Sequence, residues 1–469
     1  MPYENELASK SSHSDIVRNP EVASFLENCE YLRRPSEEEV RHAIAEFKVP
    51  PDTRELSLPE HIIAIDGSYY EASISDQLPS TKVGYIKLGC VLIKFSEFSA
   101  LRDTESGLVD PMRVARLGKG SAPLTMTVPS ANLLMEGESN VRDSFRRAVS
   151  DYFGSTATRF VPQDQTTSLR STLFELASRR SGGLGTNKPD VLVLHRCPCC
   201  NEPAVEVRDS PNPQRCPRCH SAVYPTDCLR VWEDVTDFQS NAEAMSRLMI
   251  ATEHLLPIHY IRYLANNSLA SLASTAFFVD GPLAVFGNPA WIHGPIMSYL
   301  SEINARLETA GLSRLVMIGI QKTGQVADHL QFLDRFLPNN RLLPITDDYR
   351  YEHILAGRDP SSNGFGSETY YGQDFILKTP SGRTFVFALP YPFSSKSTAG
   401  LTFAIAKTEI DRYAELARAI AVIQHFESDL YANAVVPVAL AHRHTAISLV
   451  PGGRVLDLLS KQHFSTIES

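Results

Sequence analysis

The sequence lacks a long hydrophobic run. A transmembrane helix needs roughly 18 or more consecutive apolar residues, whereas the longest apolar stretches here are interrupted by Asp280 or by His425 and Glu427. The first residues, MPYENELASKSSHSD, are polar and contain no apolar core of the kind found in a signal peptide. These absences predict a protein that does not span a membrane, and a cytoplasmic location is the default expectation.

Positive charge is also scarce. The chain has 45 Lys and Arg against 54 Asp and Glu, which gives a formal net charge of −9. This balance argues against a protein that coats nucleic acid through bulk electrostatics. The Gly-rich segment at 181–186 precedes Lys188, but its spacing does not fit a phosphate-binding loop. We therefore expect no nucleotide motor within the chain itself.

Cysteine is rare outside one short segment. Five of the eight cysteines lie between positions 197 and 219, which is wrong for a distributed disulfide framework and typical of a metal site in a reducing compartment. Two Cys-x2-Cys pairs separated by 15 residues match the spacing of a zinc ribbon. Four thiolates complete a closed, structural tetrahedron around Zn²⁺. The predicted ligands are Cys197, Cys200, Cys216 and Cys219.

Other interpretations of this segment remain open. Cys199, Cys228 and His220 are weaker alternative ligands, because none of them has the paired spacing. The thiols can also be read as buried core residues or as a redox pair. Residues 159–230 contain ten Lys and Arg and seven Asp and Glu, a net charge of +3, so the rest of the chain carries −12. The ribbon is therefore a candidate DNA contact. An equally good interpretation is that its zinc site only stabilises the inserted segment.

Strand and helix patterns alternate along the chain. Apolar runs predict strands at 61–65, 83–95, 275–279 and 314–321 and a hairpin at 374–390. Helical periodicity predicts helices at 36–47, 139–153, 166–180, 240–266, 291–310, 326–335 and 408–430. With 469 residues, the alternation predicts a large α/β core with one or two appendages.

Two of the predicted strands end in an aspartate. IIAIDGSYY ends its apolar run at Asp66 and AFFVDGPLA at Asp280, and each is read as a strand followed by an Asp-Gly turn. An isolated Asp-Gly is usually only a turn. If the two strands are neighbours, however, the carboxylates meet at one edge of the sheet and can bind hard divalent cations. Two such ions can clamp the attacking and leaving oxygens of a phosphodiester.

Both aspartate segments resemble the metal-binding motifs of the NurA nucleases. VVPVALAHRHTAIS at 435–448 is similar to the C-terminal motif of that family, a Pro followed by an Ala-His pair. IGIQKT at 318–323 resembles the strand-plus-Lys segment that follows the second aspartate. The resemblance covers about 61–96 and 240–450, and the ribbon and much of 100–187 lie outside it.

The resemblance implies a fold and an activity. The expected fold class is α/β, an RNase H-like mixed sheet flanked by helices, with the four-cysteine zinc ribbon inserted. The expected domains are an N-terminal helical segment at 1–60, a first core part with a helical insertion at 61–187, the ribbon at 188–230 and a second core part at 231–469. Members are manganese-dependent nucleases with 5′-to-3′ exonuclease and single-strand endonuclease activity. They work as dimers with a hexameric HerA-type ATPase, here in DNA repair and end processing or in antiviral defence.

The resemblance also assigns site residues. Asp66 and Asp280 match the two metal-binding aspartates, and His442 matches the C-terminal histidine because Ala441 precedes it, although His444 is only two residues away. The implied set binds Mn²⁺ or Mg²⁺, and the imidazole favours Mn²⁺.

The family glutamate and tyrosine are harder to place. Helix 240–266 offers Glu243 and Glu253, and we prefer Glu253 because the segment LMIATEHLLPIHYI places it on the helix nearest the strand of Asp280. The predicted strand DFILKT has Phe375 where a tyrosine is expected, so the tyrosine stays unassigned, with Tyr370 and Tyr371 just upstream. Two lysines, Lys322 and Lys378, are candidate phosphate contacts or simply solvated side chains.

Two other functions are compatible with the sequence. The chain can be a non-catalytic DNA-binding or adaptor subunit that keeps the fold, although the intact aspartates argue against this. It can also be an RNase H-like enzyme that acts on RNA or on an RNA–DNA hybrid. Metal-dependent cleavage tests the first alternative, and a panel of substrates tests the second.

Overall fold

The structure is a computed structural model that describes residues 18–29, 35–74, 78–101, 114, 117, 123–210, 213–355, 357–359, 364–398, 402–428 and 434–446. It divides into two compact units, Met1–Glu46 and Phe47–Ser469. The first unit contains α2 (Pro20–Glu27) and α3 (Glu37–Ala45). Helix α3 begins within one residue of the predicted helix 36–47. Its start is capped, because the Ser36 hydroxyl accepts from the Glu39 N–H and the Glu39 carboxylate accepts from the Ser36 N–H.

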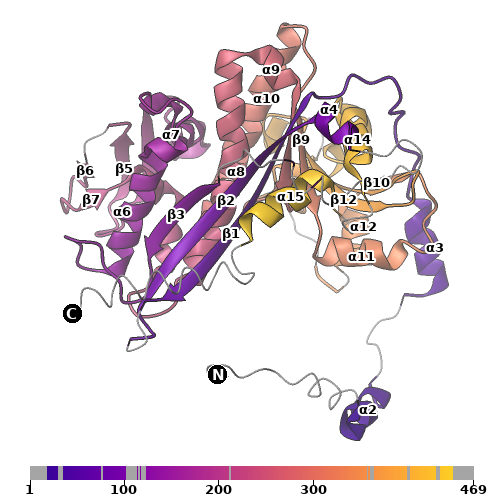
Figure 1. Ribbon diagram of the computed structural model, residues 1–469, viewed down its shortest axis with the longest axis horizontal. Coiled ribbons are helices and arrows are strands. Elements are labelled where there is room, and N and C mark those ends of the chain that lie inside the picture. Colours follow the sequence, from indigo (N-terminus) through magenta and orange to yellow (C-terminus); the bar gives the residue numbers. More distant parts are fainter. Residues whose placement is uncertain are drawn as a thin grey trace. The chain divides into compact units, whose positions relative to one another are not determined.

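The second unit is built around a mixed sheet, several strands of which are labelled in Figure 1. The sheet has eight strands in the order β10-β11-β12-β9-β8-β1-β2-β3. Strands β1–β3 form an antiparallel meander, β8 and β9 run parallel to β1, and β10–β12 extend the sheet in antiparallel fashion. The family resemblance implied a mixed α/β sheet of this kind, and the expectation is confirmed. The strands are β1 (His61–Ser73), β2 (Lys82–Lys94), β3 (Leu124–Pro129), β8 (Thr275–Asp280), β9 (Val316–Gln321), β10 (Arg341–Pro344), β11 (Gly372–Lys378) and β12 (Thr384–Pro390).

Helices cover both faces of this sheet, which explains why its central strands are apolar on both sides. Along β1, Ile63 and Ile65 pack into one hydrophobic cluster, and Ile62 and Ala64 pack into the other. The first cluster includes side chains of α6 (Val141–Gly154), α7 (Leu169–Ser178), α8 (Ala242–Asn267) and α10 (His293–Thr309). The second includes side chains of α14 (Leu416–Phe426) and α15 (Val436–Thr445), and Figure 1 shows α15 lying across β1 and β2.

Several element bounds differ from the prediction. The expected turn after Asp66 is wrong, because β1 continues to Ser73 and pairs with β2 along its whole length. The sequence patterns did not predict β3, β10 or α15. The last predicted helix, 408–430, is shorter, since α14 spans Leu416–Phe426. Within the described ranges, no helix combines the length and the apolar character needed to cross a bilayer.

A buried carboxylate at the start of α14 gives a first testable prediction. Glu415 is 5% exposed, and its Oε2 has no hydrogen-bond partner among the described residues. Burial raises the pKa of this carboxyl group to about 7. Because the folded-state pKa lies above the unfolded value, ionisation of Glu415 destabilises the fold increasingly as the pH rises from about 4.5 to about 7.

We therefore expect Glu415→Gln to raise the free energy of unfolding by up to about 3 kcal/mol at pH 8. At pH 4.5 the variant and the wild type should be nearly equal, because the native carboxyl group is then protonated and uncharged. Urea denaturation at the two pH values measures the difference, and Glu97→Gln at an exposed position is the control. A stability change of equal size at both pH values contradicts the buried-charge explanation.

Candidate metal centre

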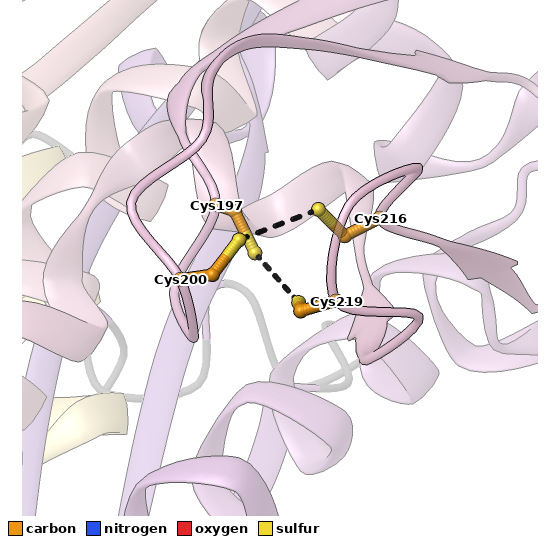
Figure 2. Close-up of side chains that lie close together, drawn as sticks. All are labelled: Cys197, Cys200, Cys216 and Cys219. Atoms are coloured by element: carbon orange, nitrogen blue, oxygen red, sulfur yellow. Dashed lines mark hydrogen bonds between the residues drawn. The ribbon is translucent and has the colours of Figure 1, made fainter.

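Four cysteines converge in the ribbon (Figure 2). The Sγ atoms of Cys197 and Cys219 are 3.7 Å apart, and those of Cys200 and Cys216 are also 3.7 Å apart. A tetrahedron with Zn–S bonds of about 2.3 Å has edges of about 3.8 Å, so the four thiols fit a zinc ion. Within the described residues, this metal-ligand group includes neither Cys199 nor Cys228.

Each pair of cysteines lies in its own turn, and the two turns have the same conformation. The Cys197 N–H donates to the Glu202 carbonyl at 2.7 Å, and the Cys216 N–H donates to the Ser221 carbonyl at 2.9 Å. Asn201 and His220 occupy equivalent places in the two turns, each with φ of 59°. The strands that hold these turns are β4 (Val191–Arg196), β5 (Pro203–Arg208), β6 (Gln214–Arg215) and β7 (Ala222–Val223).

A buried ion pair joins the ribbon to the helical layer. The Arg146 guanidinium on α6 donates to both carboxylate oxygens of Asp227, at 2.8 and 2.7 Å, and also to the Ala222 carbonyl. Both charged side chains are almost fully buried. A bidentate pair in such surroundings fixes geometry, so the ribbon is packed onto the core and not loosely appended.

The second metal-ligand group lies at the end of β8. Ile65 of β1 pairs with Val279 of β8 in parallel register, so Asp66 and Asp280 follow side by side. One ligand atom from each aspartate and one from His442 all lie within 4.8 Å of one another. The structure thus brings together three residues that the sequence resemblance assigned to one site.

Helix α15 supplies two groups to this centre. The His442 Nδ1 lies 3.0 Å from Oδ2 of Asp66, and the Thr445 hydroxyl donates to the same oxygen at 2.7 Å. The helix approaches the sheet closely at Gly89, where a Cβ atom would lie 2.7 Å from Cγ2 of Thr445. Sequence reasoning missed Thr445, whose hydroxyl holds Asp66 in place.

Glu253 on α8 lies beside the centre, on the other face of the sheet, but it is not one of the residues whose ligand atoms converge within 4.8 Å. The Gly67 N–H donates to its carboxylate, and a Cβ atom at Gly67 would lie 2.6 Å from Oε1 of Glu253. Burial raises the pKa of Glu253 well above its usual value, and the charges of Asp66 and Asp280 raise it further. The alternative, Glu243, is exposed and forms an ion pair with Arg247.

The charges at the centre are unbalanced without a cation. Burial raises the pKa of Asp280 to about 6, even though the Lys322 ammonium lies 2.6 Å from its Oδ2. When all three carboxyl groups are ionised, they and the one ammonium group leave a net charge of −2, which one divalent cation compensates. Oxygen donors with a single imidazole suit Mg²⁺ or Mn²⁺, so the residues present fit such an ion.

Phe375, Tyr371 and Lys378, which the sequence analysis considered for the site, do not belong to the metal-ligand group. Phe375 is fully buried and stacks on Phe387 at 5.2 Å between ring centroids, so it is a core residue. The Tyr371 hydroxyl lies 2.6 Å from Nδ1 of His254, the residue after Glu253. Lys378 forms an ion pair with Asp334 at 2.9 Å.

Comparison with known proteins places these residues in a family. The sequence model described as the NurA domain matches residues 60–447, a range that contains the four clustered cysteines and the group of Asp66, Asp280 and His442. No curated protein matches the chain in sequence. Because the matched range covers well over half of the 469 residues, the chain belongs to the NurA family of nucleases.

Proposed function

We propose that the protein is a divalent-metal-dependent DNA nuclease whose active site comprises Asp66, Glu253, Asp280 and His442. One observation carries the proposal: ligand atoms of Asp66, Asp280 and His442 converge within 4.8 Å from three separate elements. Mn²⁺ is the preferred ion and Mg²⁺ the second, because the donor set combines carboxylates with one imidazole.

Each residue has a distinct task in this proposal. Asp66 and Asp280 hold the metal, and Glu253 supplies a third carboxylate from the opposite face of the sheet. A bound divalent cation lowers the pKa of attacking water and neutralises charge on the phosphate. His442, whose side chain is 58% exposed and whose Nδ1 lies 3.0 Å from Oδ2 of Asp66, completes the metal shell or assists proton transfer to the leaving oxygen.

The substrate assignment is tested by a panel of labelled nucleic acids. Purified protein is incubated with single-stranded DNA, duplex DNA, RNA and an RNA–DNA hybrid in Mn²⁺, in Mg²⁺ and in EDTA. We expect metal-dependent cleavage of single-stranded DNA and 5′-to-3′ shortening of DNA ends. Preference for RNA or for the hybrid supports the alternative RNase H-like substrate. A folded protein that cleaves nothing in either metal is instead an adaptor.

We further propose that the protein works as a dimer with a hexameric HerA-type ATPase. Membership of the NurA family supports this partner. The net charge of −9 predicts weak capture of free DNA, so a partner that threads strands would help. The segment 1–60 is proposed as part of the contact, and the role lies in DNA repair and end processing or in antiviral defence.

Co-expression with an ATPase encoded next to the gene tests this partnership. We expect one complex on sizing and duplex degradation that accelerates when ATP is added. An ATPase variant that cannot hydrolyse ATP is the control and should give no acceleration. A monomer that degrades duplex DNA equally fast alone contradicts the translocase proposal and leaves the nuclease proposal standing.

A further inference from the structure

The meander beyond Asp66 has two different faces. Ile86 and Leu88 of β2, with Met126 and Val128 of β3, are buried in the cluster on the α8 side. Because side chains alternate along a strand, the intervening residues point to the opposite face. We call this set the platform, and all of its members are partly or fully exposed: Ser68, Tyr85, Lys87, Thr125 and Thr127.

The platform begins at the metal centre. Ser68 is two residues beyond Asp66 on β1, which corresponds to about 7 Å along a strand. Ser68 pairs with Lys87, and Lys87 pairs with Thr125, so the three lie in one row across the sheet. The next row beyond contains Tyr85, with Tyr70 opposite it on β1. A nucleic-acid strand that lies across this face therefore passes these rows before it reaches Asp66.

Cationic groups border the same face. Neither Lys87 nor Arg443 takes part in an ion pair among the described residues. A Cβ atom at Gly89, two residues from Lys87 on β2, would lie 3.8 Å from Cβ of His444, so the end of α15 that carries Arg443 lies beside the same face of β2. In a chain of net charge −9, a group of cations beside an acidic centre provides local attraction for phosphate.

We propose that the platform binds the single DNA strand that is being cut, with Tyr85 stacking on an unpaired base and Lys87 and Arg443 contacting phosphates. This inference rests on the proposed nuclease function and adds how the substrate is selected. Aromatic side chains combined with cations hold single strands irrespective of sequence. Paired bases hide their faces within the duplex stack, so a sheet surface of this kind favours unpaired DNA.

Three substitutions in the full chain test the platform by single-strand affinity. Binding of a fluorescent oligonucleotide is measured by anisotropy in EDTA at several salt concentrations, so that cleavage does not enter the result. Tyr85→Leu should weaken binding about 5- to 150-fold, which corresponds to the loss of one stacked base. Tyr85→Phe keeps the ring and should bind like the wild type. Lys87→Gln should reduce the salt slope by about 0.7, the value for one phosphate contact.

Two comparisons make the test specific. Lys94→Gln changes an exposed lysine at the other end of β2 and should leave affinity and salt slope unchanged. Tyr85→Leu should change duplex binding far less than single-strand binding. The proposal that the platform binds a single strand is wrong if Tyr85→Leu and Lys87→Gln leave the single-strand affinity unchanged. It is also wrong if Tyr85→Leu weakens duplex binding as much as single-strand binding.

The outcome is separable from that of the proposed function. If the wild type cleaves DNA and both variants bind normally, the nuclease proposal survives and the platform does not. If the wild type cleaves nothing, the nuclease proposal is wrong, and binding in EDTA still decides for or against the platform. Circular dichroism and thermal unfolding of each variant show whether a lost affinity comes from lost structure.

Discussion

Asparagine in place of Asp66 or of Asp280 is expected to lower Mn²⁺-dependent cleavage of single-stranded DNA by at least about 100-fold. Loss of a partner that only supports a metal ligand already costs about 10- to 100-fold, and these two carboxylates are the proposed ligands themselves. The substitution preserves shape and removes one negative charge from a centre with three carboxylates. Steady-state cleavage of a fluorescent oligonucleotide measures the effect.

Two further variants make this result interpretable. Asp328→Asn alters an exposed aspartate on α11 (Gln325–Leu333) and should cleave at the wild-type rate. Thr445→Val removes the hydroxyl that donates to Asp66 and should lower the rate about 10-fold or more, as expected for a positioning group. A folded Asp66→Asn protein with full activity shows that the active site lies elsewhere.

Serine in place of both Cys197 and Cys216 is expected to abolish zinc binding and unfold the ribbon. Each substitution removes one thiolate from a different turn, so neither half of the site remains intact. Structural zinc contributes about 10–16 kcal/mol of apparent binding free energy in small zinc domains, and this binding is coupled to folding. Elemental analysis of freshly purified protein should find one zinc per chain in the wild type and none in the variant.

Hydrogen exchange locates the effect of the zinc ligands. Residues 191–229 should lose protection in the double variant, whereas the strands around Asp66 should keep most of theirs. Cys199→Ser is the matched control, because Cys199 is exposed and lies outside the metal-ligand group. Wild-type protein without zinc, or a double variant with normal zinc content, contradicts the assignment.

The two metal-ligand groups differ in how visible they are in the sequence. The ribbon ligands follow from local spacing alone, since each pair of cysteines belongs to one turn. The pairing of Asp66 with Asp280 required two strands, distant in sequence, to be neighbours, and the alternation of strands and helices supported this. Thr445 left no comparable signal, because its contact with Asp66 spans 379 positions and hydroxyl groups are common.

The turn predicted after Asp66 shows where local rules fail. Asp-Gly ordinarily favours a turn, and the prediction is correct after Asp280, where Gly281 has φ of +99°. At Gly67 the glycine serves a different purpose, since the carboxylate of Glu253 leaves no room for a Cβ atom. Pairing with β2 then keeps β1 extended, so tertiary packing overrides the local preference.

The missed elements have a similar explanation. β10 has only four residues and is held by pairing with β11, so its own sequence carries little periodicity. The segment of α15 is rich in valine and histidine, which are weak helix formers. Pro437 in its first turn and the burial of Val436 and Leu440 against the sheet stabilise this helix.

The position of bound Mn²⁺ tests the proposed active site most directly. Crystals of the wild-type protein grown with Mn²⁺ can be measured at the manganese absorption edge, where anomalous scattering identifies the ion. We expect a manganese peak between Asp66, Asp280 and His442, separate from the zinc at the four cysteines and absent from Asp280→Asn. Manganese bound elsewhere, with these three residues unliganded in a protein that cleaves DNA, would contradict the proposed centre.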